Sequence, residues 1–189
     1  MIALASQSPQ RRAILEALGV PFRIVDVDVE EIEAGEPQEV ARDNAVRKAT
    51  AGASAAQSGE VALGVDTLVA LDGRIWGKPA DEDAAAESLR ALGGRTHDVV
   101  SCVALVRDGK PATAIEVTRV TFHPLDAATI RWYVASGEWR GRAGGYAIQG
   151  RGGALVSRVE GDYLNVVGLP VGALAGLFGG FAAFLAEGN

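Results

Sequence analysis

Short apolar runs bounded by turn-forming residues recur along the N-terminal part of the chain. Continuous or alternating apolar runs of this kind are typical of β-strands. The pattern predicts strands over residues 2–5, 22–29, 61–65, 68–71, 98–106 and 113–122. Asp72-Gly73 and Asp108-Gly109 are turn signals that reverse the chain and join antiparallel strands. The sheet is therefore expected to be mixed.

Apolar residues spaced three or four positions apart predict helices between these strands. The first helix follows Ser8-Pro9, which suit the N-cap and the first helical position, and ends at Gly19. The 189 residues suggest either a single domain covering 1–189 or two small lobes. Further helices are expected over residues 41–56, 80–92 and 125–136.

Composition narrows the classes of protein that this chain can represent. With 18 Lys and Arg against 24 Asp and Glu, the net charge is −6, so no nucleic-acid surface is expected. One cysteine and two histidines argue against an internal disulfide and a multi-histidine zinc site. The apolar segment 166–185 is about long enough for a membrane span, but Pro170 and five glycines break it. We expect a buried strand end and a core-packing helix there, no membrane partner, and a cytoplasmic protein.

Asp66 interrupts what would otherwise be one apolar strand, because it lies between the runs 61–65 and 68–71. A buried charge is costly unless it is paired or binds a metal. Asp66 is therefore either a strand-end residue that caps a turn with Thr67, or a functional carboxylate. Lys78, just after the return strand, is one candidate for its partner.

Two arginines lie in the first turn of the first expected helix, where the helix dipole alone would favour an acid. They accompany Ser6 and Ser8 and the free N–H groups of the helix start. This grouping favours a phosphate site that includes Ser6, Ser8 and Arg11. Arg12 either contributes to that site or faces solvent.

Three other polar residues have open interpretations. Glu31 lies in an acidic stretch that is usually solvated surface, although its carboxylate could help to hold Mg²⁺. Lys48, on the expected helix 41–56, would be functional only if its face looks into a cleft. His97 is expected at a strand edge, hydrogen-bonded to its surroundings rather than acting as a general base.

Glycine is concentrated near the C-terminal end, where ten of the 24 glycines fall between Gly137 and Gly172. Such a segment could be a flexible linker, but interleaved aromatic and aliphatic residues indicate ordered turns around a pocket. Gln149 lies within it and offers an amide that can donate to and accept from a nucleobase edge. Positive charge nearby comes from Arg140, Arg142 and Arg151.

The chain contains, in this order, the segments ASQSPQRRAIL, GVDTLV, WGKP and SGEWRGRAGGYAIQGRGGALVSRVEGDYLNVVGLP. Together they resemble the Maf family of nucleoside triphosphate pyrophosphatases, and the similarity runs over essentially the full chain. The resemblance implies an α/β, Maf/ITPase-like fold in which a long twisted mixed sheet is flanked by helices, with two lobes around a central cleft. It also implies hydrolysis of a nucleoside triphosphate to the monophosphate and pyrophosphate with Mg²⁺ or Mn²⁺.

The resemblance assigns roles to individual residues. Asp66 falls on the catalytic aspartate, and Glu31 would join it in holding the metal. Thr67 and Gln149 are similar to the branch that acts on dTTP and UTP, whereas the branch acting on 7-methyl-GTP differs after the aspartate and near the serine loop. Arg11 is also tied to substrate choice. The positions assigned to substrate binding are Ser8, Arg11, Arg12, Lys48, Thr67, Lys78 and Gln149.

Gln10 departs from the family pattern, which often has SPRR where this chain has Ser8-Pro9-Gln10-Arg11. Arg12 could compensate for the missing charge in binding the triphosphate. A homodimer is expected from the family. Two alternative functions stay open: a nucleotide-binding regulator of septum formation without significant turnover, and a pyrophosphatase that acts on non-standard purine nucleotides.

Overall fold

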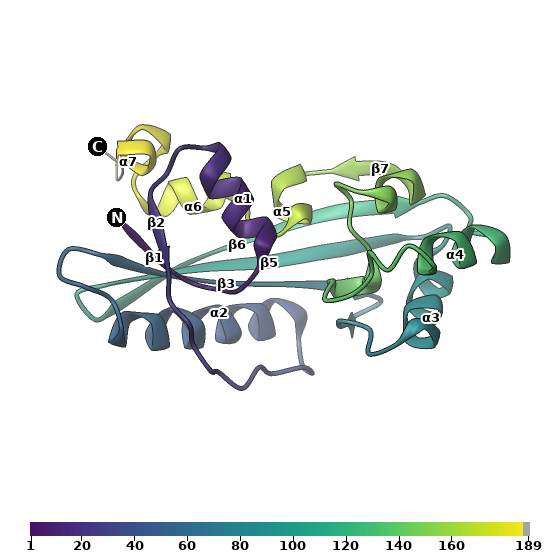
Figure 1. Cartoon of the computed structure of the whole chain (residues 1–189), viewed down its shortest axis with the longest axis horizontal. Coiled ribbons are helices and arrows are strands. Elements are labelled where there is room, and N and C mark those ends of the chain that lie inside the picture. Colours follow the sequence, from purple (N-terminus) through teal and green to yellow (C-terminus); the bar gives the residue numbers. More distant parts are fainter. Residues whose placement is uncertain (187–189) are drawn as a thin grey trace.

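The computed structural model describes residues 1–186 and contains a seven-stranded mixed sheet (Figure 1). The last three positions of the predicted domain, 187–189, lie outside the described residues. The strand order is β2-β1-β3-β5-β6-β7, and β4 pairs with β3 off this path. The strands are β1 Ile2–Ala5, β2 Phe22–Ile24, β3 Val61–Leu71, β4 Arg74–Trp76, β5 Thr96–Arg107, β6 Lys110–Phe122 and β7 Val156–Glu160.

The directions of the strands confirm the predicted mixed sheet. β1 runs parallel to both β2 and β3, whereas all other pairings are antiparallel. Both predicted turn signals join such pairs, and Asp72 and Asp108 adopt φ values of 53° and 51° there. Positive φ at both central residues suits the twist of a tight hairpin, which explains the Asp-Gly sequence.

One long helix covers one face of the sheet, and the remaining helices form two groups (Figure 1). Helix α2 (Pro37–Ser54) packs so closely on β3 that a Cβ at Gly64 would collide with the backbone of Ala45 and Ala49. The first group is α1 Pro9–Ala17, α5 Tyr163–Val167, α6 Val171–Leu177 and α7 Phe181–Ala186. The second group is α3 Glu82–Leu92 and α4 Ala127–Val134, with the 3-10 turns η1 Ala143–Gly145 and η2 Arg151–Leu155.

Three apolar clusters follow from this arrangement, and β3 contributes to all of them. Leu63 and Val65 belong to a cluster with α1, α6 and α7, whereas Val69 and Leu71 belong to a second cluster with α3 and α4. Leu68 packs with α2 in the third. Because alternate strand residues face opposite sides, the first two clusters share one face of the sheet and form the two expected lobes.

The structure corrects two of the predicted elements. The strand predicted over 22–29 ends at Ile24, because its neighbour β1 ends at Ala5 and offers no further partner. The segment 166–185 contains the end of α5 and the helices α6 and α7, and no strand, because its glycines and Pro170 divide it into short pieces. No helix within residues 1–186 is long and apolar enough to cross a membrane. The other predicted strands and helices are present, with ends shifted by a few residues.

Candidate functional site

The site lies where one edge of β3 is left without a neighbouring strand. β1 pairs with residues 61–64 of β3 and β4 pairs with residues 69–71, while β5 occupies the other edge over residues 62–70. Backbone and side chains between the two short partners are therefore open to a ligand. A cavity of about 480 Å³ opens at this gap, and both lobes and α2 line it.

Asp66 and Thr67 lie in this gap and point to opposite faces of the sheet. Asp66 faces α2 and is 7% exposed, so it sits inside a continuous strand and the alternative of a strand-end turn cap is wrong. Its Oδ1 lies 2.6 Å from Lys48 Nζ, and its Oδ2 accepts from Asn44 Nδ2 at 3.3 Å. Asn44 and Lys48 are four residues apart on α2 and therefore share one helix face.

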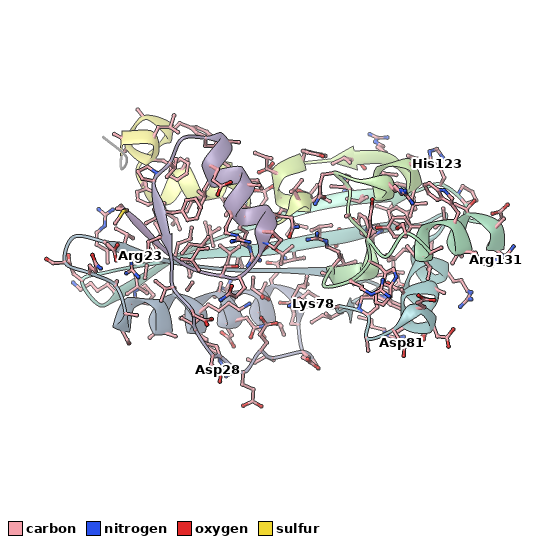
Figure 2. The ribbon with its side chains drawn as sticks, viewed as in Figure 1. Arg23, Asp28, Lys78, Asp81, His123 and Arg131 are labelled. Carbon is pink, nitrogen blue, oxygen red and sulfur yellow. The ribbon has the colours of Figure 1, made fainter. Side chains whose placement is uncertain are left out.

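Lys48 bridges two carboxylates, because its Nζ also lies 2.6 Å from Glu31 Oε1. Lys78 Nζ lies 3.5 Å from Glu31 Oε2, so Lys78 is a partner of Glu31 rather than of Asp66 as the sequence suggested. Burial alone would raise the pKa of Glu31, but the two lysines outweigh it and hold that pKa below its ordinary value. Figure 2 shows Lys78 near the middle of the molecule, far from Arg131 and His123 at one end.

Arg11 occupies the opposite side of the gap and bonds only to uncharged oxygens. Its guanidinium donates to Gly168 O at 2.9 Å, Ser6 Oγ at 2.9 Å and Thr67 Oγ1 at 3.2 Å. Burial lowers the pKa of Arg11, and the nearby carboxylates of Asp66 and Glu31 offset part of that. No neutralising carboxylate contacts it within the described residues, so its charge is available to an anion.

The side chain of Ser8, in the loop before α1, does not cap the helix as the sequence suggested. Ser8 is the N-cap of α1, but its hydroxyl donates to Gln10 Oε1 at 3.0 Å and does not cap the helix through its side chain. Ser8 and Gln10 both line the cavity, whereas Arg12 is not among the lining residues. Adjacent helical residues are about 100° apart, so a helix that turns Arg11 inward turns Arg12 away.

Gln149 reaches the cavity from the glycine-rich segment, on the side of the second lobe. That segment is ordered, and it approaches the sheet so closely that a Cβ at Gly144 would lie 2.8 Å from Val69 Cγ2. His97 is the second residue of β5 and is buried, and its Nε2 lies 2.9 Å from Tyr146 Oη, so the expected hydrogen bond near the strand end is confirmed. Burial lowers the pKa of His97 to about 4, so it is neutral at pH 7.

Sequence reasoning left two residues of the site without a role. Asn44 is one, and helical spacing from Lys48 could have revealed it; its amide also bonds Ile32 N–H and C=O at 2.8 and 2.9 Å, which holds the stretch after Glu31. Arg142 is the other: sequence reasoning named it only as nearby positive charge, whereas it lines the cavity and its Nε is buried without a hydrogen-bond partner among residues 1–186. Two carboxylates and five cations line the cavity, the cations being Arg11, Lys48, Lys78, Arg140 and Arg142.

The carboxylates of the cavity fit a metal ion whose remaining ligands come from the substrate and water. No group of three or more His, Cys, Asp or Glu side chains that could hold a metal occurs in the described part of the chain. Glu31 and Asp66 do approach each other closely enough for one ammonium to bridge them. Mg²⁺ is commonly held by one or two carboxylates together with substrate phosphates and water, and this pair fits that pattern.

Comparisons with known proteins identify a family and several related enzymes. The family described as "Maf-like protein" matches residues 1–181. The dTTP/UTP pyrophosphatase of Symbiobacterium thermophilum is 45% identical, with 90% of this chain and 88% of the relative covered. The dTTP/UTP pyrophosphatases of Pelotomaculum thermopropionicum and Xanthomonas euvesicatoria are 47% and 43% identical, covering 92% and 97% of this chain and 93% and 100% of their own.

A solved structure also aligns with the chain. The Ham1 protein of Staphylococcus aureus gives a TM-score of 0.43 at 20% identity, over 64% of this chain and 71% of that one, a likeness too weak to carry an argument. The family match is different in kind, because it covers nearly every described residue and is accompanied by relatives above 40% identity along their length. The chain therefore belongs to the Maf-like protein family.

Proposed function

We propose that the protein hydrolyses dTTP and UTP to the nucleoside monophosphate and pyrophosphate. The observation that carries the proposal is the Glu31–Lys48–Asp66 group, which lies at the open edge of β3 in a cavity whose charged lining residues are five cations and two carboxylates. The relatives named dTTP/UTP pyrophosphatase support the choice of substrate. In a chain of net charge −6, such a local excess of positive charge suits a polyphosphate.

Asp66 is the residue proposed to act on the attacking water. Pyrophosphate is released when water attacks the α-phosphorus and the bond to the bridging oxygen breaks, with the proton of the water passing to a base. Asp66 is held from two sides, by Lys48 at one oxygen and Asn44 at the other. A carboxylate fixed in this way can orient the water and accept its proton.

The triphosphate would lie against the cations of the gap. Arg11 presents a charge that no carboxylate neutralises among the described residues, and Lys78 is 57% exposed and can turn toward a ligand. Lys48 would stabilise the charge that develops on the phosphates next to Asp66. Ser8 lines the same cavity and offers its hydroxyl and the N-terminal end of α1.

Glu31 and Asp66 would hold the divalent cation, Mg²⁺ or Mn²⁺. When bound, such an ion neutralises phosphate oxygens and polarises the reacting phosphorus. The part played by the chain is to supply two carboxylates at a fixed separation, and Lys48 keeps them together. Asn44 anchors the backbone at Ile32, which restrains the position of the neighbouring Glu31.

Gln149 is the group proposed to read the pyrimidine. Uracil and thymine present a carbonyl oxygen next to an N–H, and one amide side chain can donate to the first and accept from the second. Thr67 has a different part, because its hydroxyl already contacts Arg11 at 3.2 Å and Ser101 Oγ at 2.9 Å. Thr67 would influence substrate choice by fixing the direction of the Arg11 guanidinium.

A pyrophosphate-release assay with wild type and Asp66→Asn tests the function. We expect release from dTTP and UTP with Mg²⁺ or Mn²⁺, and a loss of roughly 10²–10⁴-fold in kcat for the variant. Asparagine keeps the shape of the side chain, so the urea-unfolding transition should remain cooperative. Nucleotide binding without turnover in the wild type would favour the sensor, and wild-type turnover in Asp66→Asn would refute the role of Asp66.

A homodimer and a cytoplasmic location belong to the same proposal. The described surface exposes several large apolar side chains that a partner copy could cover, among them Trp132 and Phe181. Nucleoside triphosphates are a cytoplasmic substrate class. Light scattering of the purified protein measures the mass in solution, and a monomeric mass at micromolar concentration would remove the dimer from the proposal.

A further inference from the structure

We propose that Tyr133 and Glu138 are positioning residues that set the pyrimidine preference by fixing the loop that carries Gln149. The loop is residues 146–152 and is called the selectivity loop below. The inference rests on the proposed function, because it gives Gln149 a base to read. It concerns two side chains that lie behind the loop and outside the set of residues that line the cavity.

The two side chains hold the selectivity loop on either side of Gln149. Before it, Ala147 N–H donates to Tyr133 Oη at 2.9 Å. After it, Arg151 N–H and Gly152 N–H donate to the two oxygens of Glu138 at 3.0 and 3.3 Å. The backbone at the loop is therefore tied down two residues before and two residues after the amide.

Both holding groups are themselves rigid. Tyr133 is fully buried on α4, and burial raises its pKa to about 12, so its hydroxyl is neutral at pH 7 and can accept the amide hydrogen. Glu138 N–H donates to Ser136 Oγ at 3.2 Å. The next residue, Trp139, is 3% exposed and donates from its indole to Val134 O at 3.1 Å, which ties this stretch to the end of α4.

The sequence of the selectivity loop fits this arrangement. A Cβ at Gly150 would lie 2.6 Å from Glu138 Oε2, so only glycine lets the backbone come this close to the carboxylate. A Cβ at Gly152 would lie 2.5 Å from Ala147 O, so the loop also folds tightly on itself. Ile148 is buried in the second lobe while Gln149 is exposed at the cavity, which fixes which side chain the loop presents.

Gln149 depends on the loop because nothing else holds it. Its amide makes no hydrogen bond to any other residue in the part of the chain that the structure describes. Its backbone therefore sets where the amide can reach, and Tyr133 and Glu138 hold that backbone. Recognition by a single amide is sensitive to displacement, and a shift of about 1 Å in a positioned group can cost roughly a hundredfold.

Kinetics of Glu138→Gln with UTP and CTP test the inference. Glutamine keeps the size of the side chain but replaces one acceptor oxygen with a donor, so it cannot accept from both Arg151 and Gly152. UTP and CTP differ on the base edge that Gln149 would read and are identical in their phosphates. We expect KM for UTP to rise and the UTP-over-CTP ratio of kcat/KM to fall by roughly ten- to a hundredfold, with kcat changed less than threefold.

Two further variants and a control make the test independent of folding. Gly150→Ala pushes on the Glu138 carboxylate from the loop side and should give the same loss of preference, and Tyr133→Phe removes the acceptor for Ala147. Glu87→Gln makes the same change at an exposed position of α3 with no hydrogen bond among the described residues, and should match wild type. Urea unfolding of each variant reports whether it is folded.

The outcomes separate this inference from the proposed function. If wild-type protein releases no pyrophosphate from UTP, the proposed function fails and the inference fails with it. If the wild type cleaves UTP in preference to CTP and folded Glu138→Gln keeps that preference and its KM, only the inference is overturned. An equal loss of kcat for UTP and CTP, with the ratio unchanged, also overturns it, because that result indicates a merely structural role.

Discussion

The two walls of the cavity are built in different ways. One wall, formed by the loop before α1, by α2 and by β3, is held by contacts between side chains, and Lys48 alone touches two carboxylates at 2.6 Å. The other wall, the glycine-rich stretch, is held by hydrogen bonds to its backbone, some from side chains and some from other backbone groups. Ser88 Oγ, for example, donates to Gly144 O at 2.7 Å. The contacts in the first wall hold charged side chains in place, and those in the second hold the path of the backbone.

This difference predicts which property each wall controls. Charges that are held in a cavity act on the charge that develops during phosphoryl transfer, so substitutions in the first wall should change kcat or phosphate binding. The backbone of the second wall carries Gln149, which is proposed to read the base. Substitutions behind this wall should therefore change the preference among bases. The predictions below begin with the largest expected effect on the charged wall.

After Asp66→Asn, the substitution Lys48→Met should have the largest effect. The substitution leaves Glu31 and Asp66 without their shared cation, and removing one partner of a buried pair typically costs about 3–5 kcal/mol. Glu31 is 37% exposed, so we expect a loss of about 2–3 kcal/mol in the free energy of unfolding. We also expect kcat for UTP to fall by roughly 10²-fold or more, measured as pyrophosphate release at saturating UTP.

Lys78→Met is the matched control for Lys48→Met. Lys78 is 57% exposed and lies 3.5 Å from the same Glu31, so its pairing should contribute less than about 1 kcal/mol to stability. Urea unfolding of both variants compares the two lysines directly. Equal stability losses in the two would show that the bridge between Glu31 and Asp66 is not what Lys48 supplies.

Arg11→Lys should have a smaller effect and act mainly on KM. The guanidinium donates to three oxygens from three different nitrogens, and an ammonium cannot reproduce that fork. Buried acceptors such as Gly168 O would lose their donor, at a cost of about 1–3 kcal/mol in unfolding free energy. We expect KM for UTP to rise roughly ten- to a hundredfold, because the remaining charge would be misplaced.

Arg12→Lys is the control for Arg11→Lys and tests the role that the sequence assigned to Arg12. Because Arg12 does not line the cavity, KM should match wild type and stability should stay within about 0.5 kcal/mol. A rise in KM as large as that of Arg11→Lys would return Arg12 to the phosphate site.

Periodicity predicted most of the helices and strands, because each reflects the local alternation of apolar and polar residues. It could not predict that β1 and β4 pair with the two ends of the same edge of β3 and leave a gap between them. That gap is a property of the pairing of distant segments. For the same reason the position of Asp66 inside a continuous strand was not decided by its neighbours in sequence.

Site residues that belong to a sequence motif could be predicted. Residues outside the motifs that hold those residues in place could not. Asp66, Thr67 and Gln149 stand in quoted segments, and the structure brings all three to one cavity. Asn44 and Tyr133 lie outside those segments, and their contacts join residues 22 and 14 positions apart. Only the folded chain shows that they hold the residues that the motifs contain.

His97 should leave activity at pH 7 unchanged, and its effect, on stability alone, appears only in acid. It lies behind the second wall, bonded to Tyr146, and its pKa of about 4 lies below the ordinary 6.5 because it is buried. Between these values the unfolded chain binds a proton that the folded chain does not, so the free energy of unfolding falls as pH falls from 6.5 towards 4. The slope is about 1.4 kcal/mol per pH unit.

Urea unfolding at pH 7 and pH 4.5 isolates this contribution. At pH 7 both states hold His97 neutral, so its pKa shift contributes nothing there, whereas at pH 4.5 it should cost the wild type about 2–3 kcal/mol. His97→Gln removes the titrating group, so its stability should decline less between the two pH values. His123→Gln, at an exposed position at the end of the molecule (Figure 2), should decline as the wild type does. An equal decline in His97→Gln and wild type would mean that His97 can be protonated inside the fold, and that charge is tolerated behind the second wall as it is in the first.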